Sequence, residues 1–316
     1  MVLSFDKGKM IPLKTLMALL IVADHLSYHI DVIYLMPFRE LGAPIVSVFF
    51  FISGFGLHKS FQSRGQSYLD CFLRRRIWKV VLPLLISLAL SYCLLWDSSR
   101  DFVGEWRNML FLGIPILPYS WFAISIVVYY FVFYFCYRFV SDRWNAFCVL
   151  CFVVLLMLLA IICGYDRCWW VSSLAFPTGI FYSIKEEWLY AFCKHKKVNY
   201  WLLLCGSVLL FCALYLTHNP YVWVLCYVMI PFIVALVVAR LPVAKFCWPW
   251  VSFIASISYE MYLCQGIPME FFERTIIIPQ PLLYIVSVYL AVFVLAWSIH
   301  SICALSYNNS CISSTT

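Results

Sequence analysis

Segments of about 20 apolar residues recur along the whole chain, each long enough to cross the hydrocarbon core of a bilayer as a helix. With 65% hydrophobic and only 12% charged residues over 316 positions, the chain cannot bury its apolar surface in one water-soluble core. The sequence therefore predicts an all-α fold, a polytopic transmembrane helical bundle of about ten spans. The predicted spans lie near residues 11–32, 41–58, 79–96, 119–138, 146–164, 169–184, 199–217, 221–239, 249–268 and 281–304.

Basic side chains gather in alternate loops, which indicates how the helices are oriented. The N-terminal segment and the even-numbered loops hold most of the Lys and Arg, whereas the odd-numbered loops hold acidic residues such as Asp97, Asp101 and Glu105. Both termini are therefore expected in the cytoplasm. The net charge of +7 follows from this topology and does not indicate nucleic-acid binding. The first span has no small-x-small cleavage site, so we expect it to stay as an anchor in the cytoplasmic (inner) cell membrane.

Lys14 and His25 lie on one face of the first span, because eleven residues make nearly a whole number of helical turns. Ionisable residues are costly inside a transmembrane helix, so each marks a candidate functional site. Two other interpretations stay open. Lys14 can snorkel to the interface while His25 bonds another helix, and His25 with His29 has the spacing of a metal pair. No third ligand is evident, so no metal site is predicted. Asp24 precedes His25, but a helical neighbour is turned by about 100°.

The second span contains Ser53 and Gly54 within the aromatic run VSVFFFISGF. Small residues at this place let a helix or a ligand approach the backbone closely. Ser53 as a covalent nucleophile would need a base within hydrogen-bond reach, which the sequence does not identify. Close helix packing and a catalytic contribution of Ser53 both remain open.

A basic cluster precedes the third span in the segment FLRRRIWKVVLP, and it consists of Arg74, Arg75, Arg76 and Lys79. Guanidinium groups are planar and can hold a phosphate with two hydrogen bonds. The cluster therefore suits a polyphosphate ligand. The same side chains would also anchor the helix against anionic membrane lipids.

The ninth span, FIASISYEMYLCQGIP, carries several polar side chains. Ser258, Tyr262 and Gln265 share one helical face, and Glu260 points elsewhere. A glutamate in the middle of the membrane requires a partner, either as a structural anchor to Tyr, Trp or Lys or as part of a proton-handling site. The fifteen cysteines show no ligand spacing, so we expect them to pack as small apolar residues.

Taken in order, these residues resemble the acyltransferase-3 family, the integral-membrane O-acyltransferases that modify surface polysaccharides and related glycans. Lys14 and His25 match the family's basic residue, ten intervening residues and histidine, with Lys in place of the usual Arg. FFFISGF matches the FFxxSGF motif, the arginines match the basic loop, and ISYEMYLCQ is similar to the SYxLYLxH pattern. Gln265 stands where the family frequently has histidine, and an amide cannot act as acid or base. The resemblance implies a transmembrane domain over residues 1–306, followed by a short polar tail over 307–316.

The resemblance also implies that cytoplasmic acyl-coenzyme A, most often acetyl-coenzyme A, is the co-substrate, with no permanently bound cofactor. The acceptor would be a hydroxyl of a glycan, a surface polysaccharide or a lipid-linked sugar. His25 would be the general base, Ser53, Tyr262 or Gln265 would stabilise the oxyanion, and Asp24 could polarise His25. The candidate catalytic residues are thus His25, Ser53, Tyr262 and Glu260, and the candidate donor-binding residues are Lys14, Arg74, Arg75, Arg76 and Lys79.

Two other functions remain open at this point. A proton-coupled transporter or flippase of glycan or lipid has the same composition and would use Lys14, His25 and Glu260 for proton coupling. Another membrane acyltransferase, acting on lipid or protein, would keep the chemistry and change the acceptor. Consumption of an acyl-coenzyme A thioester distinguishes the transporter from both enzymes. The sequence does not indicate an oligomeric state.

Overall fold

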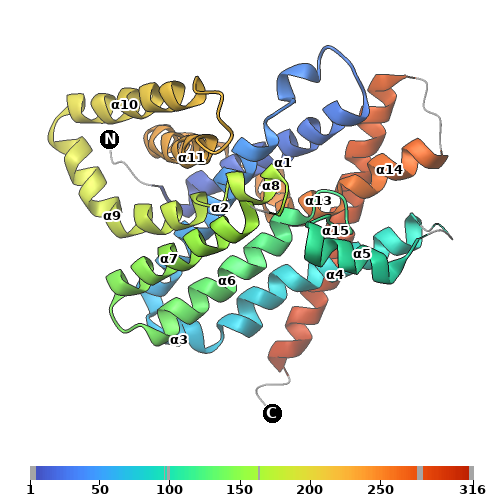
Figure 1. The fold of residues 1–316 in the computed structure, drawn as a ribbon, viewed down its shortest axis with the longest axis horizontal. Helices are drawn as coiled ribbons and strands as arrows, with labels where there is room; N and C mark the ends of the chain where they lie inside the picture. The colour runs from blue at the N-terminus through green and yellow to red at the C-terminus, as the bar shows by residue number, and fades with distance from the viewer. Residues whose placement is uncertain (1–4, 96, 98–99, 163, 276–279, 313–316) are drawn as a thin grey trace. The chain divides into compact units, whose positions relative to one another are not determined.

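The computed structural model describes residues 5–95, 97, 100–162, 164–275 and 280–312 (Figure 1). These residues form helices and connecting loops with no strand among them, which confirms the all-α prediction. Seven of the described helices are long and apolar enough to cross a membrane. They are Lys7–His29, Gly42–Arg64, Leu73–Leu94, Trp121–Phe139, Lys197–Tyr215, Trp223–Arg240 and Pro281–Ser306.

The other three predicted spans have a different form. α7 (Arg143–Ile162) is apolar over a shorter segment, and α9 (Ala175–His195) carries charged side chains in its second half. The ninth span is interrupted at Ile257 and Gln265, which divides it into three short helices. A continuous helix would clash at Pro268, whose ring would meet the carbonyl of Cys264 and which has no N–H to donate to it. The three pieces are α12 (Pro249–Ser256), α13 (Ser258–Cys264) and α14 (Gly266–Thr275).

The chain divides into two compact units. Two helices, α1 (Lys7–His29) and α6 (Trp121–Phe139), are shared, with one end of each helix in unit 1 and the other end in unit 2. Unit 1 consists of Met1–Leu13, Ala43–Leu73 and Val128–Trp248, and unit 2 consists of Lys14–Gly42, Arg74–Val127 and Pro249–Thr316.

Unit 1 is built around a cluster of aromatic rings. Phe5, Phe51, Phe55 and Tyr182 meet edge to face with centroids 5.3 to 6.1 Å apart, an arrangement that suits the charge distribution of aromatic rings. α9, α10 and α11 pack against one another, and α7 packs on α8 and α9 (Figure 1). The helices introduced here are α2 (Gly42–Arg64), α3 (Gln66–Asp70), α8 (Arg167–Val171), α10 (Lys197–Tyr215) and α11 (Trp223–Arg240).

Two glycines of unit 1 let α2 and α9 approach each other closely. A Cβ added at Gly54 would overlap the carbonyl oxygen of Phe176, and one added at Gly179 would overlap that of Phe51. The contact is reciprocal, because each glycine faces a backbone carbonyl of the other helix. The close helix packing considered for Gly54 is therefore present.

Unit 2 is centred on α13, whose side chains and flanks are almost wholly buried. α13 packs against α4 and α15, and α14 packs against the same two helices. The longer helices here are α4 (Trp78–Leu94), α5 (Phe102–Leu112) and α15 (Pro281–Ile312). α15 continues into the segment 307–316 that was predicted to be a polar tail, of which residues 313–316 lie outside the described residues.

Candidate active site

His25 lies near the end of α1, which two hydrogen bonds fix within unit 2. Thr15 Oγ1 donates to the carbonyl oxygen of Val251 at 2.7 Å, and Tyr289 donates to that of Leu19 at 2.8 Å. His25 itself is 8% exposed. These bonds hold α1 in place, so the buried imidazole of His25 has a fixed position within unit 2.

Tyr119 covers one face of the His25 ring. The two rings are stacked, with centroids 3.8 Å apart and planes inclined by 14°. Tyr119 has a backbone φ of 64°, in the left-handed region that bulky residues rarely adopt. The hydroxyl of Tyr262 donates a hydrogen bond to the Tyr119 carbonyl, and a Cβ added at Gly266 would come within 2.6 Å of Pro118. Residues of α13 and α14 thus enclose the segment that carries Tyr119.

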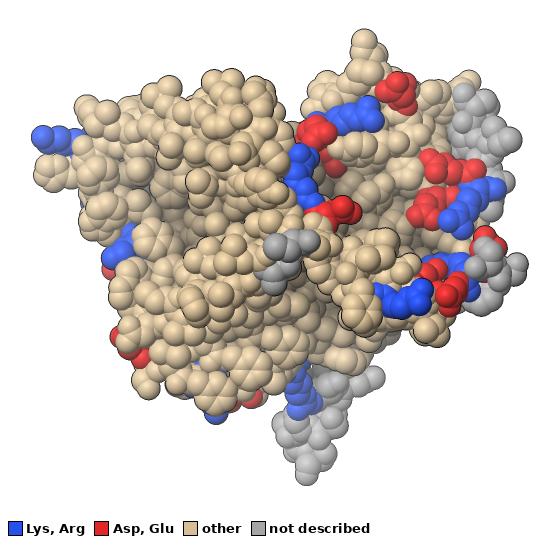
Figure 2. Space-filling view, viewed as in Figure 1, with Lys and Arg blue, Asp and Glu red and all other residues tan. Residues whose placement is uncertain are grey.

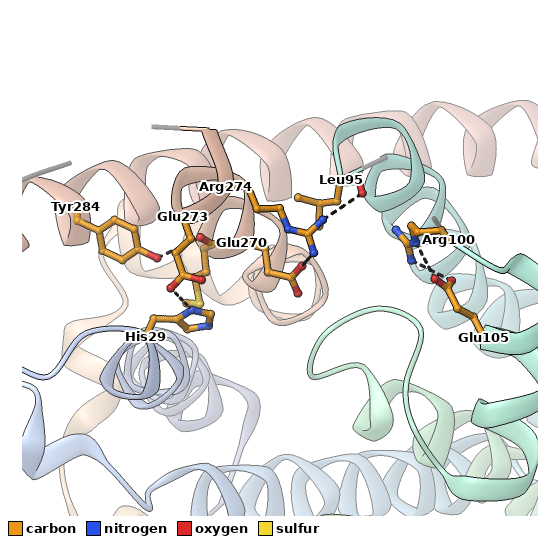
Figure 3. Close-up of polar contacts among 9 residues, drawn as sticks. His29, Leu95, Arg100, Glu105, Glu270, Glu273, Arg274 and Tyr284 are labelled. Carbon is orange, nitrogen blue, oxygen red and sulfur yellow. Dashed lines mark hydrogen bonds and ion pairs between the residues drawn. The ribbon is translucent and has the colours of Figure 1, made fainter. Parts of the chain in front are cut away.

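His29 joins Tyr119 to α14. Its Nδ1 lies 2.6 Å from Glu273 Oε1 and its Nε2 lies 2.9 Å from the Tyr119 hydroxyl. Figure 3 shows the His29 ring turned toward the Glu273 carboxylate. The residues from α1, α14 and the loop before α6 therefore form one connected group around His25.

Three polar atoms at this site have no hydrogen-bond partner in the described part of the protein. They are Nδ1 of His25 and both amide atoms of Gln265. Gln265 is fully buried, and its side chain is within interaction range of the His25 ring. Buried polar groups are almost always paired, so these atoms are candidates for bonding a substrate.

The main partner of Asp24 is the backbone of Gly42 and not His25, the partner considered from the sequence. Its Oδ1 accepts the backbone N–H of Gly42 at 2.9 Å, at the first residue of α2. Its Oδ2 lies 3.8 Å from His25 Nε2, which is too long for a hydrogen bond. At that distance the carboxylate can still stabilise a positive charge on the imidazole.

Glu260 and Tyr262 bond different partners, as their helical spacing predicts. Glu260 Oε1 lies 2.9 Å from Nδ1 of His300 on α15. The partner is therefore a histidine, and not the Tyr, Trp or Lys that we expected. Glu260 has no contact with His25 among the interactions described in unit 2, so the structure does not bring these two candidate residues together.

Unit 2 also contains a polar cavity of about 210 Å³. Arg100 forms two hydrogen bonds with Glu105, at 2.7 and 3.0 Å, and Arg274 bonds Glu270 at 2.9 Å (Figure 3). Figure 2 shows acidic and basic side chains gathered over α5 and α14 on this face. Pro118, next to Tyr119, forms part of the wall. The lining residues are Ser91, Leu95, Asp97, Arg100, Glu105, Ile116, Pro118, Glu270 and Arg274.

The basic cluster lies at the beginning of α4. Arg74, Arg75 and Arg76 occupy a π-helical turn, Leu73–Ile77, in which Arg74 and Arg75 are exposed and Arg76 is half-buried. Such turns are often found at functional sites. Lys79 is exposed on the next turn, and Lys14 is half-buried on α1. The cavity residues Ser91 and Leu95 follow at the other end of the same span.

Ser53 belongs to unit 1, where it is half-buried on α2 beside Gly54. The other candidate residues all belong to unit 2, and they are Lys14, His25, Arg74, Arg75, Arg76, Lys79, Glu260 and Tyr262. Within the described residues, no group of three His, Cys, Asp or Glu side chains could hold a metal ion.

Sequence reasoning missed Tyr119, Glu273 and the cavity. The sequence places His29 one turn from His25, at the spacing of a metal pair, and does not indicate its contacts with Glu273 and Tyr119. The acidic and basic residues of α14, in GIPMEFFER, were the available signal, because opposite charges close together in a short segment often form ion pairs. Their partners lie far away in the chain, so spacing alone does not identify them.

A family model described as an acyltransferase domain matches residues 12–301. No curated protein and no solved structure matches the chain significantly. The match covers the span that holds Lys14 and His25, the basic cluster, and the broken ninth span with Tyr262 and Gln265. Together with the membrane-length helices, it shows that the chain belongs to the acyltransferase-3 family and is a membrane acyltransferase.

Proposed function

We propose that the protein is an O-acyltransferase that moves an acyl group, typically acetyl, from acyl-coenzyme A to a hydroxyl of a glycan. The acceptor is a surface polysaccharide or a lipid-linked sugar, so the protein serves polysaccharide biosynthesis. The observation that carries the proposal is the buried imidazole of His25, which lies within interaction range of the Gln265 side chain. Nδ1 of His25 and both amide atoms of Gln265 have no hydrogen-bond partner among the described residues.

His25 is the general base of the proposed reaction. It takes the proton from the acceptor hydroxyl as that oxygen attacks the thioester carbonyl. The Gln265 N–H groups donate to the oxyanion that forms, and Asp24 stabilises the imidazolium across 3.8 Å. The carbon–sulfur bond then breaks, and the thiolate of coenzyme A takes the proton from His25.

Among the three candidate oxyanion donors, Gln265 has the most favourable position. The Tyr262 hydroxyl already donates to the Tyr119 carbonyl, and Ser53 has no described contact that aims its hydroxyl at the His25 ring. Gln265 is buried beside His25 with its donors unpaired in the described structure. The residue that departs from the family pattern therefore keeps a role as hydrogen-bond donor, although it cannot transfer a proton.

The donor phosphates bind at the basic cluster. Arg74, Arg75 and Arg76 share one turn, and Lys79 and Lys14 add two ammonium groups. The span Leu73–Leu94 that follows has 22 residues and is about 30 Å long, close to the thickness of the hydrocarbon core. The pantetheine arm then reaches along the span toward His25.

The acceptor sugar binds in the cavity beside Tyr119. Its wall carries carboxylates and guanidinium groups, which hydrogen-bond hydroxyl groups well and offer little to an acyl chain. The paired charges leave the cavity without a strong excess of either sign, which suits a neutral sugar.

The proposed topology places the two substrates on opposite sides of the membrane. We propose that the chain crosses the cytoplasmic (inner) cell membrane about ten times with both termini in the cytoplasm. The basic cluster then faces the cytoplasm and the cavity faces outward. The protein works with membrane lipids around it and binds no nucleic acid.

The test uses purified protein in lipid nanodiscs with labelled acetyl-coenzyme A. Wild type should bind it and release coenzyme A, and His25→Gln should bind it without turnover. The matched control is His195→Gln, at the exposed end of α9, which should behave as wild type. A folded wild type that binds no acyl-coenzyme A of any chain length would overturn the proposal. Transfer of the acyl group to a lipid or a protein, but not to a sugar, would show that the acceptor is not a glycan.

A further inference from the structure

We infer that His29, Glu273 and Tyr119 form a positioning unit that fixes the orientation of the His25 ring. The inference rests on the proposed role of His25 as general base. In this scheme none of the three residues transfers a proton or bonds a substrate, so they act through His25. The three residues come from the C-terminal part of α1, the loop before α6 and α14, and all three belong to unit 2.

The hydrogen bonds assign a direction to the chain of contacts. A carboxylate can only accept, so Glu273 Oε1 takes the Nδ1–H of His29 at 2.6 Å. In the tautomer with the proton on Nδ1, Nε2 is an acceptor and takes the hydroxyl hydrogen of Tyr119 at 2.9 Å. A carboxylate that orients a histidine in this way fixes both its tautomer and its ring plane.

Tyr119 contacts His25 directly, so the restraint on the Tyr119 ring also restrains the imidazole. The centroid of its ring lies 3.8 Å from that of His25, and the two planes are inclined by 14°. Rotation of the imidazole about its Cβ–Cγ bond would therefore bring it into a clash with Tyr119. The other polar neighbours of the ring are the Gln265 side chain, which lies within interaction range, and Asp24, whose Oδ2 is 3.8 Å from Nε2. The stacked ring is the contact that restrains the tilt of the imidazole plane.

Both ends of Tyr119 are held. The hydroxyl is bound by His29, and the carbonyl accepts the hydroxyl hydrogen of Tyr262. Two anchors restrain a ring more strongly than one, which explains how a tyrosine stays at a φ of 64°. A loss of either anchor should let the His25 ring turn, and misplacement of a catalytic group by about 1 Å can cost 100-fold in rate.

The test compares turnover with donor affinity in nanodiscs. His29→Gln, Glu273→Gln and Tyr119→Phe should each lower kcat about 10-fold, with the KM for acetyl-coenzyme A within about twofold of wild type. Tyr119→Leu, which removes the stacked ring, should lower kcat about 100-fold. The double variant of His29→Gln and Tyr119→Phe should lose no more than the stronger single change, because both break the same contact. Glu273→Asp should recover part of the loss.

The control is Asp31→Asn, an exposed acid two residues after His29, which should keep the wild-type kcat. A second readout does not need turnover. In protein labelled with ¹³C-histidine, the His25 ring signal should move when Tyr119→Leu removes the ring current, and should broaden in Glu273→Gln.

The outcomes separate this inference from the proposed function. If wild type needs His25 for turnover but His29→Gln, Glu273→Gln and Tyr119→Phe match Asp31→Asn, the positioning unit is refuted and the function stands. If no protein consumes acyl-coenzyme A but the His25 signal changes as described, the function fails and the restraint on the ring stands. If the variants only lower the unfolding temperature, with kcat per folded molecule unchanged, the contacts are structural and the inference is overturned.

Discussion

Tyr119 lies flat against His25, with ring centroids 3.8 Å apart and ring planes 14° apart. Tyr119 reaches this place with a left-handed backbone, φ 64°, which costs a bulky residue on the order of 1–3 kcal/mol. The surrounding contacts offset this cost, since both the hydroxyl and the carbonyl of Tyr119 are hydrogen-bonded. Strain held in place beside a buried histidine is a feature of functional sites rather than of ordinary loops.

Tyr262→Phe should lower both stability and turnover, because it removes the hydrogen bond to the Tyr119 carbonyl and keeps the edge contact with Phe122 at 5.2 Å. We expect a loss of about 1 kcal/mol in the free energy of unfolding and a kcat reduced about 10-fold. Thermal unfolding and acyl transfer in nanodiscs measure the two effects. Tyr284→Phe is the matched control, because that buried tyrosine also donates to a carbonyl, that of Met269, at 3.2 Å. It should lose stability alone. Equal kcat values in the two variants would contradict the prediction.

Gly54→Ala and Gly179→Ala should each destabilise unit 1. Each added methyl group overlaps a backbone carbonyl of the facing helix, which cannot move like a flexible side chain. Overpacking of this kind costs about 1–3 kcal/mol. Gly56→Ala is the control on the same helix, since its Cβ would meet nothing within 4 Å, and alanine favours a helix over glycine by up to about 1 kcal/mol. Thermal unfolding in detergent should therefore rank Gly56→Ala above the other two. An equal loss in all three would show that α2 and α9 are not packed as described.

The helical architecture could be predicted from the sequence because the length of an apolar segment decides whether a helix can cross a membrane. The seven membrane-length helices all overlap predicted spans. The interruptions at Ile257 and Gln265 were missed. Pro268 carried a local signal for the second break, but hydropathy over a window of about 20 residues averages such a signal away.

The candidate site could be predicted only where its residues share a helix. Lys14 and His25 lie on one continuous α1, so their spacing fixes their relation. Tyr119 reaches His25 from a separate segment 94 positions along the chain, and Glu273 bonds His29 over 244 positions. No periodicity links such residues. They meet because α14 and the loop before α6 pack together, which is a property of the tertiary fold.

Glu105 should make stability depend on pH. The Arg100 guanidinium, through two hydrogen bonds, holds the pKa of the Glu105 carboxyl below its ordinary value of 4.5. A carboxyl with a lower pKa in the folded state stabilises the fold at pH values above 4.5, and this contribution is lost as the pH falls through the folded pKa. Glu105→Gln should therefore be less stable than wild type at pH 7 and lose less on acidification. Glu187→Gln, at an exposed position on α9, is the control. Parallel unfolding curves for wild type and Glu105→Gln from pH 7 to pH 3 would refute the pairing.

Replacing Arg74, Arg75 and Arg76 together by Gln should raise the Kd for acetyl-coenzyme A by at least about 10-fold, because charge-assisted bonds to phosphate are each worth about 1.5–3 kcal/mol. The wild-type affinity should fall with salt, and that of the variant should depend on salt less. Lys194, Lys196 and Lys197 offer a matched triple change to Gln in another basic loop. Binding measured with coenzyme A and with its form lacking the 3′-phosphate would show which phosphate is held. An unchanged affinity for acetyl-coenzyme A in the arginine variant would show that the cluster does not bind the donor, and would favour its role as an anchor against anionic lipids.

Gln265→Leu should raise stability and abolish most activity, a combination that ordinary core substitutions do not give. The Gln265 amide is fully buried with both polar atoms unpaired in the described structure, so leucine removes a desolvation cost of about 1–3 kcal/mol. If the amide stabilises the oxyanion, its loss should reduce kcat about 100-fold and leave the KM for acetyl-coenzyme A unchanged. Ser87→Ala is the control, because Ser87 Oγ is also buried and unpaired in unit 2, and it should gain stability at full activity. A Gln265→Leu protein with wild-type turnover would exclude the oxyanion role, and one that unfolds at a lower temperature would show that Gln265 has a structural partner.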